Sequence, residues 1–298
     1  MTGLAITQLH VRFANGAHVL RGIDLTVAKG ERLALVGESG CGKTTLIRAL
    51  LGLLEPGARV LGQMLLDGQE VPGPDPRALR GTRIGYVPQN PLSALNPLLP
   101  VGRQIAEAWE AHGRRIADAT LSAELAAVGI ADATRMMTYR PARWSGGMLQ
   151  RALILAATAH RPALVLADEP TSAVDRPLAR QMLELLAERS GTLIAVTHDL
   201  DLIDGLVDRV VVLYGGRIVE DAPAARFLVG PRHPYARALL EALPRPGRLP
   251  RGLDGDPPSP LAPDAGCAFA PRCPSPCALA AELPMLAEGV ACHLGTGR

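Results

Sequence analysis

A glycine-rich segment at residues 37–44 constrains the fold of this chain more than any other feature of the sequence. It reads Gly-Glu-Ser-Gly-Cys-Gly-Lys-Thr and matches the pattern G-x-x-x-x-G-K-[ST]. An apolar stretch at 32–36 precedes it, and a helical pattern over 43–54 follows it. A strand, a glycine-rich loop and a helix in this order are typical of a phosphate-binding loop in an α/β protein. The sequence therefore predicts an α/β core whose loop binds phosphate groups.

The residue types in this loop suit that chemistry. Glycines allow successive backbone N–H groups to turn towards phosphate oxygens, and the N-terminus of the following helix adds partial positive charge. Lys43 is expected to contact the β- and γ-phosphates of a nucleotide, and the Thr44 hydroxyl to bind Mg²⁺. Lys43 and Lys29 are the only lysines of the chain, which makes the match specific. The candidate nucleotide-binding residues of this segment are Gly37, Glu38, Ser39, Gly40, Cys41, Gly42, Lys43, Thr44 and Thr45.

Composition excludes several other classes of protein. Of the 298 residues 48% are hydrophobic and 20% are charged, which argues against a disordered chain. The 31 basic and 29 acidic residues leave a formal charge of +2, so no nucleic-acid partner is expected. No apolar run approaches the roughly 18 residues that span a bilayer, and no secretory signal pattern opens the chain. We therefore expect a cytosolic protein without a membrane-spanning segment of its own.

The residue pattern also predicts the other parts of the fold. Alternating apolar and polar residues at 4–13 and 19–27 predict a small antiparallel β-subdomain. Amphipathic windows at 104–111 and 121–128 predict a helical subdomain inserted at about 90–160. Apolar strands alternating with a helix indicate a parallel sheet in the core. The core strands are expected at 32–36, 84–87, 163–167 and 192–197, with a helix at 178–189, a hairpin at 210–214 and 217–219, and a final helix at 234–243.

Two carboxylates follow one of these buried strands directly. Asp168 and Glu169 come after the apolar stretch that begins at Leu164. Ligands of open α/β sheets bind at the carboxyl ends of the strands, which is where these side chains are expected. Asp168 is predicted to hold Mg²⁺, and Glu169 to polarise a water molecule that attacks the γ-phosphate.

The end of the chain has a different composition. Residues 1–243 are predicted to form the nucleotide-binding domain, and seven prolines and four glycines mark 244–266 as a linker. The remaining segment, 267–298, contains Cys267, Cys273, Cys277 and Cys292. In a reducing compartment such a group indicates metal or cluster ligation rather than disulfides. This segment is therefore expected to be a short cysteine-rich C-terminal extension.

Residues 144–151, Trp-Ser-Gly-Gly-Met-Leu-Gln-Arg, resemble the signature motif of the nucleotide-binding subunits of ABC transporters. The resemblance runs in order along about 1–243 and implies a P-loop ATPase that hydrolyses ATP with Mg²⁺. It implies that Ser145, Gly146 and Gly147 approach the γ-phosphate of ATP held by a second subunit. It further implies adenine stacking by Phe13, sensing of Mg²⁺ and the attacking water by Gln89, an interface loop at 172–175 containing Asp175, and γ-phosphate contact by His198.

Three further segments resemble the ATPases of peptide and nickel importers. They are residues 89–97, 233–244 and 267–274. The resemblance implies a subunit that energises import of di- or oligopeptides, or of nickel or a metallophore. It also implies a second ATPase subunit, identical or homologous, two transmembrane permease subunits and, indirectly, an extracytoplasmic substrate-binding protein. Such a subunit lies peripherally at the cytoplasmic face of the plasma (inner) membrane.

The cysteines of the extension leave three alternatives open. In peptide-importer ATPases cysteines at this position are associated with an iron-sulfur cluster, so the resemblance implies a [4Fe–4S] group. Thiolates also bind Zn²⁺ well, and the cysteines could simply be reduced thiols. The site is expected to be structural, not part of the ATP chemistry.

Two other classes are less consistent with the sequence. A soluble ABC ATPase acting on ribosomes or DNA typically has two cassettes or a long coiled-coil insertion, and this sequence has neither pattern. A GTPase commonly recognises guanine with Asn-Lys-x-Asp, whereas neither Lys29 nor Lys43 lies in that pattern.

Overall fold

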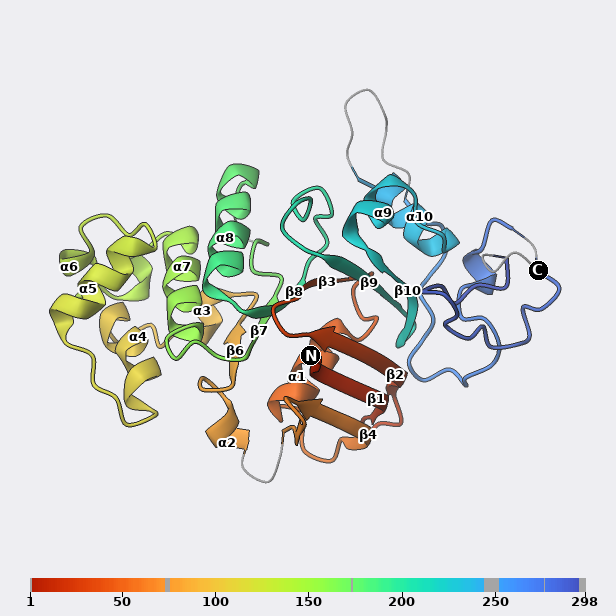
Figure 1. Cartoon of the computed structure of the whole chain (residues 1–298), viewed down its shortest axis with the longest axis horizontal. Coiled ribbons are helices and arrows are strands. Elements are labelled where there is room, and N and C mark those ends of the chain that lie inside the picture. The colour runs from red at the N-terminus through yellow and green to blue at the C-terminus, as the bar shows by residue number, and fades with distance from the viewer. Residues whose placement is uncertain (1, 73–75, 173, 244–251, 276, 295–298) are drawn as a thin grey trace. The chain divides into compact units, whose positions relative to one another are not determined.

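The computed structural model describes residues 2–72, 76–172, 174–243, 252–275 and 277–294 (Figure 1). The first part of the predicted linker, 244–251, lies outside the described residues, as does Ala173 of the predicted interface loop. Backbone contacts divide the chain into two compact units: Met1–Pro74 together with Val196–Arg298, and Asp75–Ala195. Both units combine helices with strands, which confirms the predicted α/β class.

The first unit begins with an antiparallel sheet in the strand order β2-β1-β4-β5. The strands are β1 (Thr2–Arg12), β2 (His18–Ala28), β4 (Arg59–Leu66) and β5 (Gln69–Glu70). β1 and β2 pair with Leu4 opposite Val27 and Val11 opposite Leu20, so the predicted pair of strands is confirmed. β4 was not expected, and Figure 1 shows it beside β1. This sheet is the predicted antiparallel β-subdomain.

A second group of strands in this unit leads to the phosphate loop. β3 (Arg32–Val36) pairs in parallel with β9 (Arg209–Tyr214), and β10 (Arg217–Pro223) returns antiparallel to β9. α1 (Lys43–Leu51) follows β3 and ends where Gly52 adopts a left-handed conformation, three residues earlier than predicted. The predicted hairpin and final helix are confirmed, with α9 (Ala224–Val229) and α10 (Pro234–Glu241) after β10.

The core of the first unit includes residues from the end of the chain. Phe269 is 3% exposed and belongs to the same buried cluster as Val210, Phe227 and Tyr235. It precedes the short 3-10 helix η2 (Ala270–Arg272). Residues of the predicted extension therefore pack on the unit that contains the phosphate loop.

The second unit holds a parallel strand pair and most of the helices. β6 (Ile84–Val87) pairs in parallel with β7 (Leu164–Asp168), and β8 (Thr192–Val196) follows β7 in the sheet. A buried cluster including Val101, Leu125 and Trp144 forms the helical core. The helices are α2 (Pro76–Leu79), α3 (Pro91–Ala94), α4 (Val101–Glu110), α5 (Asp118–Ala127), α6 (Ala133–Met136), η1 (Pro141–Arg143), α7 (Gly146–Ala157) and α8 (Arg176–Arg189).

The helices α4 and α5 confirm the two amphipathic windows, and α8 confirms the predicted helix between β7 and β8. Within the described ranges, no helix has both the length and the apolar character needed to cross a membrane.

Candidate functional site

The phosphate loop connects β3 to α1 in the first unit. Gly37, Gly40 and Gly42 have φ angles of +151°, +80° and +112°, which residues with a side chain rarely adopt. A Cβ atom on Gly37 would lie 2.2 Å from the carbonyl oxygen of Leu213. A Cβ atom on Gly42 would lie 2.6 Å from Cδ2 of Leu20. The backbone conformation and the close packing therefore both require glycine in this loop.

Lys43 is oriented by the loop itself. Its side chain is buried, and its Nζ donates to the carbonyl oxygens of Gly37 at 2.7 Å and Glu38 at 2.9 Å. The ammonium group thus lies at the N-terminus of α1, where the helix adds partial positive charge. Burial raises the pKa of the neighbouring Cys41 thiol, which keeps it protonated.

The other loop positions are accessible to different degrees. Ser39 and Gly40 are exposed, whereas Thr44 and Thr45 are half-buried in the first turn of α1. The loop can therefore offer exposed backbone, a hydroxyl and a cation to an anionic ligand.

His198 lies next to the strand that leads into this loop. The N–H group of Thr197 donates to the carbonyl oxygen of Leu35 at 3.3 Å, which places Thr197 beside β3 within the first unit. His198 follows directly and is exposed. Phe13 lies in the turn between β1 and β2, where its N–H donates to Ala17 at 2.9 Å, and it is half-buried. The roles of both residues remain predictions.

In the second unit the structure brings Gln89 and Glu169 together. β6 and β7 are in register, with Val87 opposite Ala167, so their carboxyl ends lie side by side. Gln89 Nε2 donates to Glu169 Oε2 at 2.8 Å. Asp168 is the last residue of β7 and is 4% exposed. The two carboxylates and the glutamine therefore form one polar group at the end of this strand pair.

A buried glutamine supports this group and was not predicted as a site residue. Gln150 on α7 is 3% exposed, and its Nε2 donates to the carbonyl oxygen of Pro88 at 3.1 Å. Pro88 directly precedes Gln89, so α7 holds the segment that carries the catalytic candidate. The sequence signal that could have identified Gln150 is a polar residue at a position where the pattern of the helix predicts a buried apolar one.

Ser145 is the N-cap of α7. Its Oγ accepts a hydrogen bond from the N–H group of Met148 at 3.2 Å, and the residue is exposed. Trp144, which stands where the ABC signature usually has leucine, is buried in the helical core and donates from Nε1 to Met136 at 3.2 Å. The residue before the cap is thus buried, whereas Ser145 at the start of α7 is accessible.

Asp175 caps α8 in the same way, since its Oδ1 accepts from the N–H group of Leu178 at 3.0 Å. A Cβ atom on Gly147 would lie 2.6 Å from Cδ2 of Leu178, so the starts of α7 and α8 approach closely. Gly146 is half-buried in the first turn of α7. The structure therefore places Ser145, Gly146, Gly147 and Asp175 at two neighbouring helix N-termini.

The four cysteines of the extension surround one cavity of about 140 Å³ in the first unit. None of them forms a disulfide, and burial raises the pKa of the Cys267 thiol. Cys273 Sγ lies 3.3 Å from the carbonyl oxygen of Ser275. In the part of the chain that the structure describes, no group of three or more His, Cys, Asp or Glu residues is close enough to hold a single metal ion.

Comparisons with known proteins agree with this geometry. Residues 20–172 match the ABC transporter family, and residues 219–277 match the C-terminal region of oligopeptide/dipeptide transporters. The chain is 39% identical to a probable peptide ABC transporter ATP-binding protein, y4tR, of Sinorhizobium fredii, covering 96% of this chain and 91% of that protein. It is 36% identical to the dipeptide transport ATP-binding protein DppD of Bacillus subtilis, covering 91% and 87%.

Solved structures have the same fold. A dimeric post-hydrolysis structure of the ATP-binding cassette MJ0796 with ADP and phosphate has a TM-score of 0.65 at 23% identity, covering 74% of this chain and 98% of that one. The chain belongs to the ABC transporter family as an ATP-binding subunit, and its chemistry is ATP hydrolysis. Within that family it carries the C-terminal region found in oligopeptide and dipeptide transporters.

Proposed function

We propose that this chain hydrolyses ATP to energise the import of di- or oligopeptides through separate membrane permeases. The observation that carries the proposal is the match of residues 219–277 to the peptide-transporter C-terminal region, combined with 39% and 36% identity to two peptide-transport subunits over nearly the whole chain. The relatives named above do not specifically support nickel or a metallophore as the cargo. An action on ribosomes or DNA is not favoured by these relatives.

The residues of the first unit would bind the nucleotide. Backbone N–H groups of the phosphate loop and Lys43 would bind the phosphates, with Phe13 against adenine and His198 at the γ-phosphate. Thr44 would supply an oxygen ligand of the kind that Mg²⁺ prefers, and so would Asp168, which belongs to the second unit. Mg²⁺, when bound, neutralises negative charge on the β- and γ-phosphates.

Residues of the second unit would carry out the hydrolytic step. The Glu169 carboxylate would take a proton from the attacking water, because a carboxylate within hydrogen-bonding reach can act as a general base. Gln89, which donates to Glu169 Oε2 at 2.8 Å, would orient this carboxylate and sense the bound Mg²⁺. Ser145, Gly146, Gly147 and Asp175 would act on ATP held by a second ATPase subunit.

The partners would be a second ATPase subunit, two permeases and, indirectly, an extracytoplasmic binding protein. The chain would then lie peripherally at the cytoplasmic face of the membrane. Exposed apolar side chains near α3 support a protein contact there, because Leu92 is 58% and Leu98 is 70% exposed. These leucines follow Gln89 by three and nine residues in the sequence, so a short segment would transmit a change in the nucleotide state to them.

Copurification of the chain with its permeases, followed by reconstitution into proteoliposomes, tests the proposal. We expect di- or oligopeptides, presented with the cognate binding protein, to stimulate ATP hydrolysis and to accumulate inside the vesicles. A chelated nickel complex serves as the control ligand. Stimulation by the nickel complex without any response to peptides would contradict the peptide assignment while leaving the ATPase assignment intact.

We also propose that the four cysteines hold a structural [4Fe–4S] cluster. Thiolates are suitable ligands, and all four line one cavity of about 140 Å³. Anaerobic purification followed by iron, sulfide and zinc analysis tests this, with Cys41→Ser as the control that keeps the same metal content. Folded protein without iron and sulfide would contradict the cluster.

A further inference from the structure

An arginine of the C-terminal extension forms a bidentate ion pair with the phosphate loop. Arg272 Nη1 lies 2.7 Å from Glu38 Oε2, and Arg272 Nη2 lies 2.9 Å from Glu38 Oε1. The Arg272 side chain is 4% exposed, and that of Glu38 is 28% exposed. Paired N–H···O bonds of this type fix the orientation of both groups and are stronger than neutral hydrogen bonds. Glu38 is the second residue of the phosphate loop.

Glu38 is also held by hydrogen bonds of its backbone. Its N–H group donates to the Tyr235 hydroxyl at 2.7 Å, and its carbonyl oxygen accepts from Lys43 Nζ at 2.9 Å. Tyr235 on α10 is fully buried. Glu38 therefore connects the cation of the loop to α10 and, through its carboxylate, to the extension.

Hydrogen bonds other than those to Glu38 also orient the guanidinium of Arg272. Its Nε donates to the carbonyl oxygen of Asp254 at 3.0 Å, and its Nη1 donates to the Tyr214 hydroxyl at 3.3 Å. Phe269, one turn earlier, packs edge-on against Tyr214 with ring centroids 5.3 Å apart. The extension thus presents Arg272 from an anchored segment, so little side-chain freedom is lost when the ion pair forms.

The negative charge of Glu38 links its ion pair with Arg272 to nucleotide binding. The loop must accept a triphosphate, and a carboxylate within the loop repels phosphate oxygens unless it is neutralised. The bidentate contact neutralises the carboxylate and holds it in one orientation. Ser39 and Gly40, which follow Glu38, are exposed, and Lys43 lies further along the same loop.

We propose that Arg272 is a positioning residue for nucleotide binding, which acts through Glu38 by neutralising it and by fixing the conformation of the phosphate loop. The proposal rests on the nucleotide-binding role given to that loop above. It assigns a role in ATP binding to the extension, separate from the thiol-lined cavity.

A double-mutant cycle on the full chain tests this inference. The variants are Arg272→Ala, Glu38→Gln and the double variant, and the measurements are the Kd for Mg²⁺-ATP, the KM and kcat of hydrolysis, and the thermal midpoint. We expect Arg272→Ala to raise Kd and KM about tenfold, because an uncompensated carboxylate then faces the phosphates, with kcat changed less than about twofold. In the Glu38→Gln background, Arg272→Ala should raise Kd less than about twofold.

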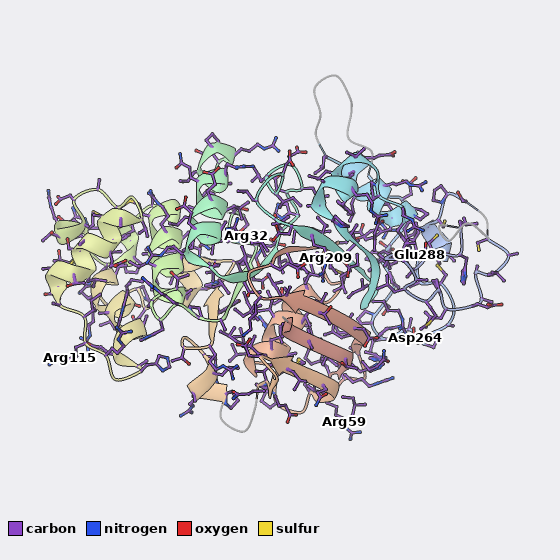
Figure 2. All side chains as sticks on the ribbon, viewed as in Figure 1. Arg32, Arg59, Arg115, Arg209, Asp264 and Glu288 are labelled. Atoms are coloured by element: carbon purple, nitrogen blue, oxygen red, sulfur yellow. The ribbon has the colours of Figure 1, made fainter. Side chains whose placement is uncertain are left out.

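The matched control is Arg217→Ala. Arg217 pairs with Asp264, which Figure 2 labels, and so attaches the segment before the extension without touching the phosphate loop. We expect this variant to lower the thermal midpoint and to leave Kd unchanged. Arg272→Lys keeps the charge but not the paired geometry, and it should bind ATP with a Kd between those of wild type and Arg272→Ala.

Three results would overturn the inference. They are an unchanged Kd in folded Arg272→Ala or Arg272→Lys protein, an equal loss of affinity in the Glu38→Gln background, and an equal loss in Arg217→Ala. A wild-type chain that binds no ATP would instead contradict the role proposed for the phosphate loop.

Discussion

Glu169 adopts an uncommon backbone conformation directly after β7. Its φ angle is +45°, in the left-handed region that residues other than glycine enter rarely. The chain turns sharply there, and the carboxylate meets Gln89 from the neighbouring strand end. Strained backbone of this kind is often found where a side chain must be aimed at a reacting group.

Glu169→Gln tests the hydrolytic role of this carboxylate. The amide has almost the same size but cannot take a proton, so we expect kcat for ATP hydrolysis to fall about 100-fold or more. ATP binding should persist and trap a closed dimer, visible by light scattering. Glu184→Gln on α8 is the control, since Glu184 pairs only with nearby Arg180 among the contacts described. Turnover by Glu169→Gln within about twofold of wild type would exclude the general-base role.

His18 provides a residue-scale test of pH dependence. Its ring is 7% exposed, and its Nε2 lies 3.2 Å from His10 Nδ1, so one ring donates and the other accepts. Burial lowers the pKa of His18 below 6.5, and the charges of Arg12, Arg21 and His10 lower it further, against Asp264. The unfolded chain therefore takes up this proton at a higher pH than the folded chain does.

We expect the free energy of unfolding to fall as the pH drops below about 6.5. The stabilising contribution of neutral His18 is complete above the unfolded pKa and is lost towards the lower folded pKa. Denaturant titrations at a series of pH values measure the slope. His18→Gln, which retains hydrogen-bonding groups but does not titrate, should flatten it, and an unchanged slope in that variant would assign the effect to other groups.

Site residues that lie in short contiguous motifs could be predicted from the sequence. Residues that support them from distant parts of the chain could not. The phosphate loop and the Asp168-Glu169 pair lie in short contiguous patterns whose spacing reflects local chemistry. Gln150 and Arg272 act through contacts 62 and 234 residues away in the chain. No spacing rule links such positions, because tertiary packing alone brings them together.

At the scale of elements, β6 and α7 approach unusually closely. A Cβ atom on Gly85 would lie 2.2 Å from the carbonyl oxygen of Ala157 and 3.0 Å from Pro162 Cγ. Backbone atoms cannot move away as the end of a flexible side chain can. The absence of a side chain at Gly85 is therefore what allows the strand to pass the end of this helix.

Gly85→Ala should therefore destabilise the protein by about 3 kcal/mol, as overpacking against backbone does. Gly191→Ala is the matched control, because a Cβ atom there would meet nothing within 4 Å, and it should change stability by less than about 0.5 kcal/mol. Urea denaturation of both variants measures the difference. Equal stabilities would mean that the β6–α7 contact relaxes without cost.

The differences between the predicted and the observed secondary structure have physical reasons. β4 has five consecutive exposed residues, so it lacks the alternation that marks a half-buried strand. α8 begins at Arg176 rather than 178, because Asp175 caps it and Pro177 occupies its first turn. By contrast, the continuous apolar run of β3 defined its bounds directly.

At the scale of the whole molecule, the surface near α3 is the candidate contact with the permeases. Asn90 caps α3 by accepting from the N–H group of Leu92, so the helix start does not depend on the leucine side chain. Leu92 and Leu98 are both more than half exposed. Their replacement should therefore affect a partner more than the fold.

Leu92→Gln together with Leu98→Gln should lower peptide transport about fivefold or more in proteoliposomes, as loss of an interface anchor does. Basal ATPase activity should stay within about twofold of wild type. Leu61→Gln, on β4 and 64% exposed, is the control and should affect neither activity. Equal losses of transport and hydrolysis would indicate that the two leucines act on catalysis and not on coupling.

The arrangement of the molecule into two compact units could not be predicted from patterns along the chain. One unit is assembled from two segments, Met1–Pro74 and Val196–Arg298, which are separated by the whole of the other. The predicted domain boundaries at 243 and 266 rest on composition, and they remain predictions. A proline- and glycine-rich composition indicates where regular secondary structure ends. It does not indicate on which surface the residues that follow will pack.

Phe269 has a practical consequence for anyone who wishes to shorten this protein. It occupies the same buried cluster as Tyr214 and Tyr235, although it lies beyond the last long helix. A fragment that stops after α10 would expose these tyrosine rings to water and would lack a piece of its own interior. Truncation directly after α10 should therefore yield aggregation-prone material, because apolar rings that Phe269 covers would face solvent.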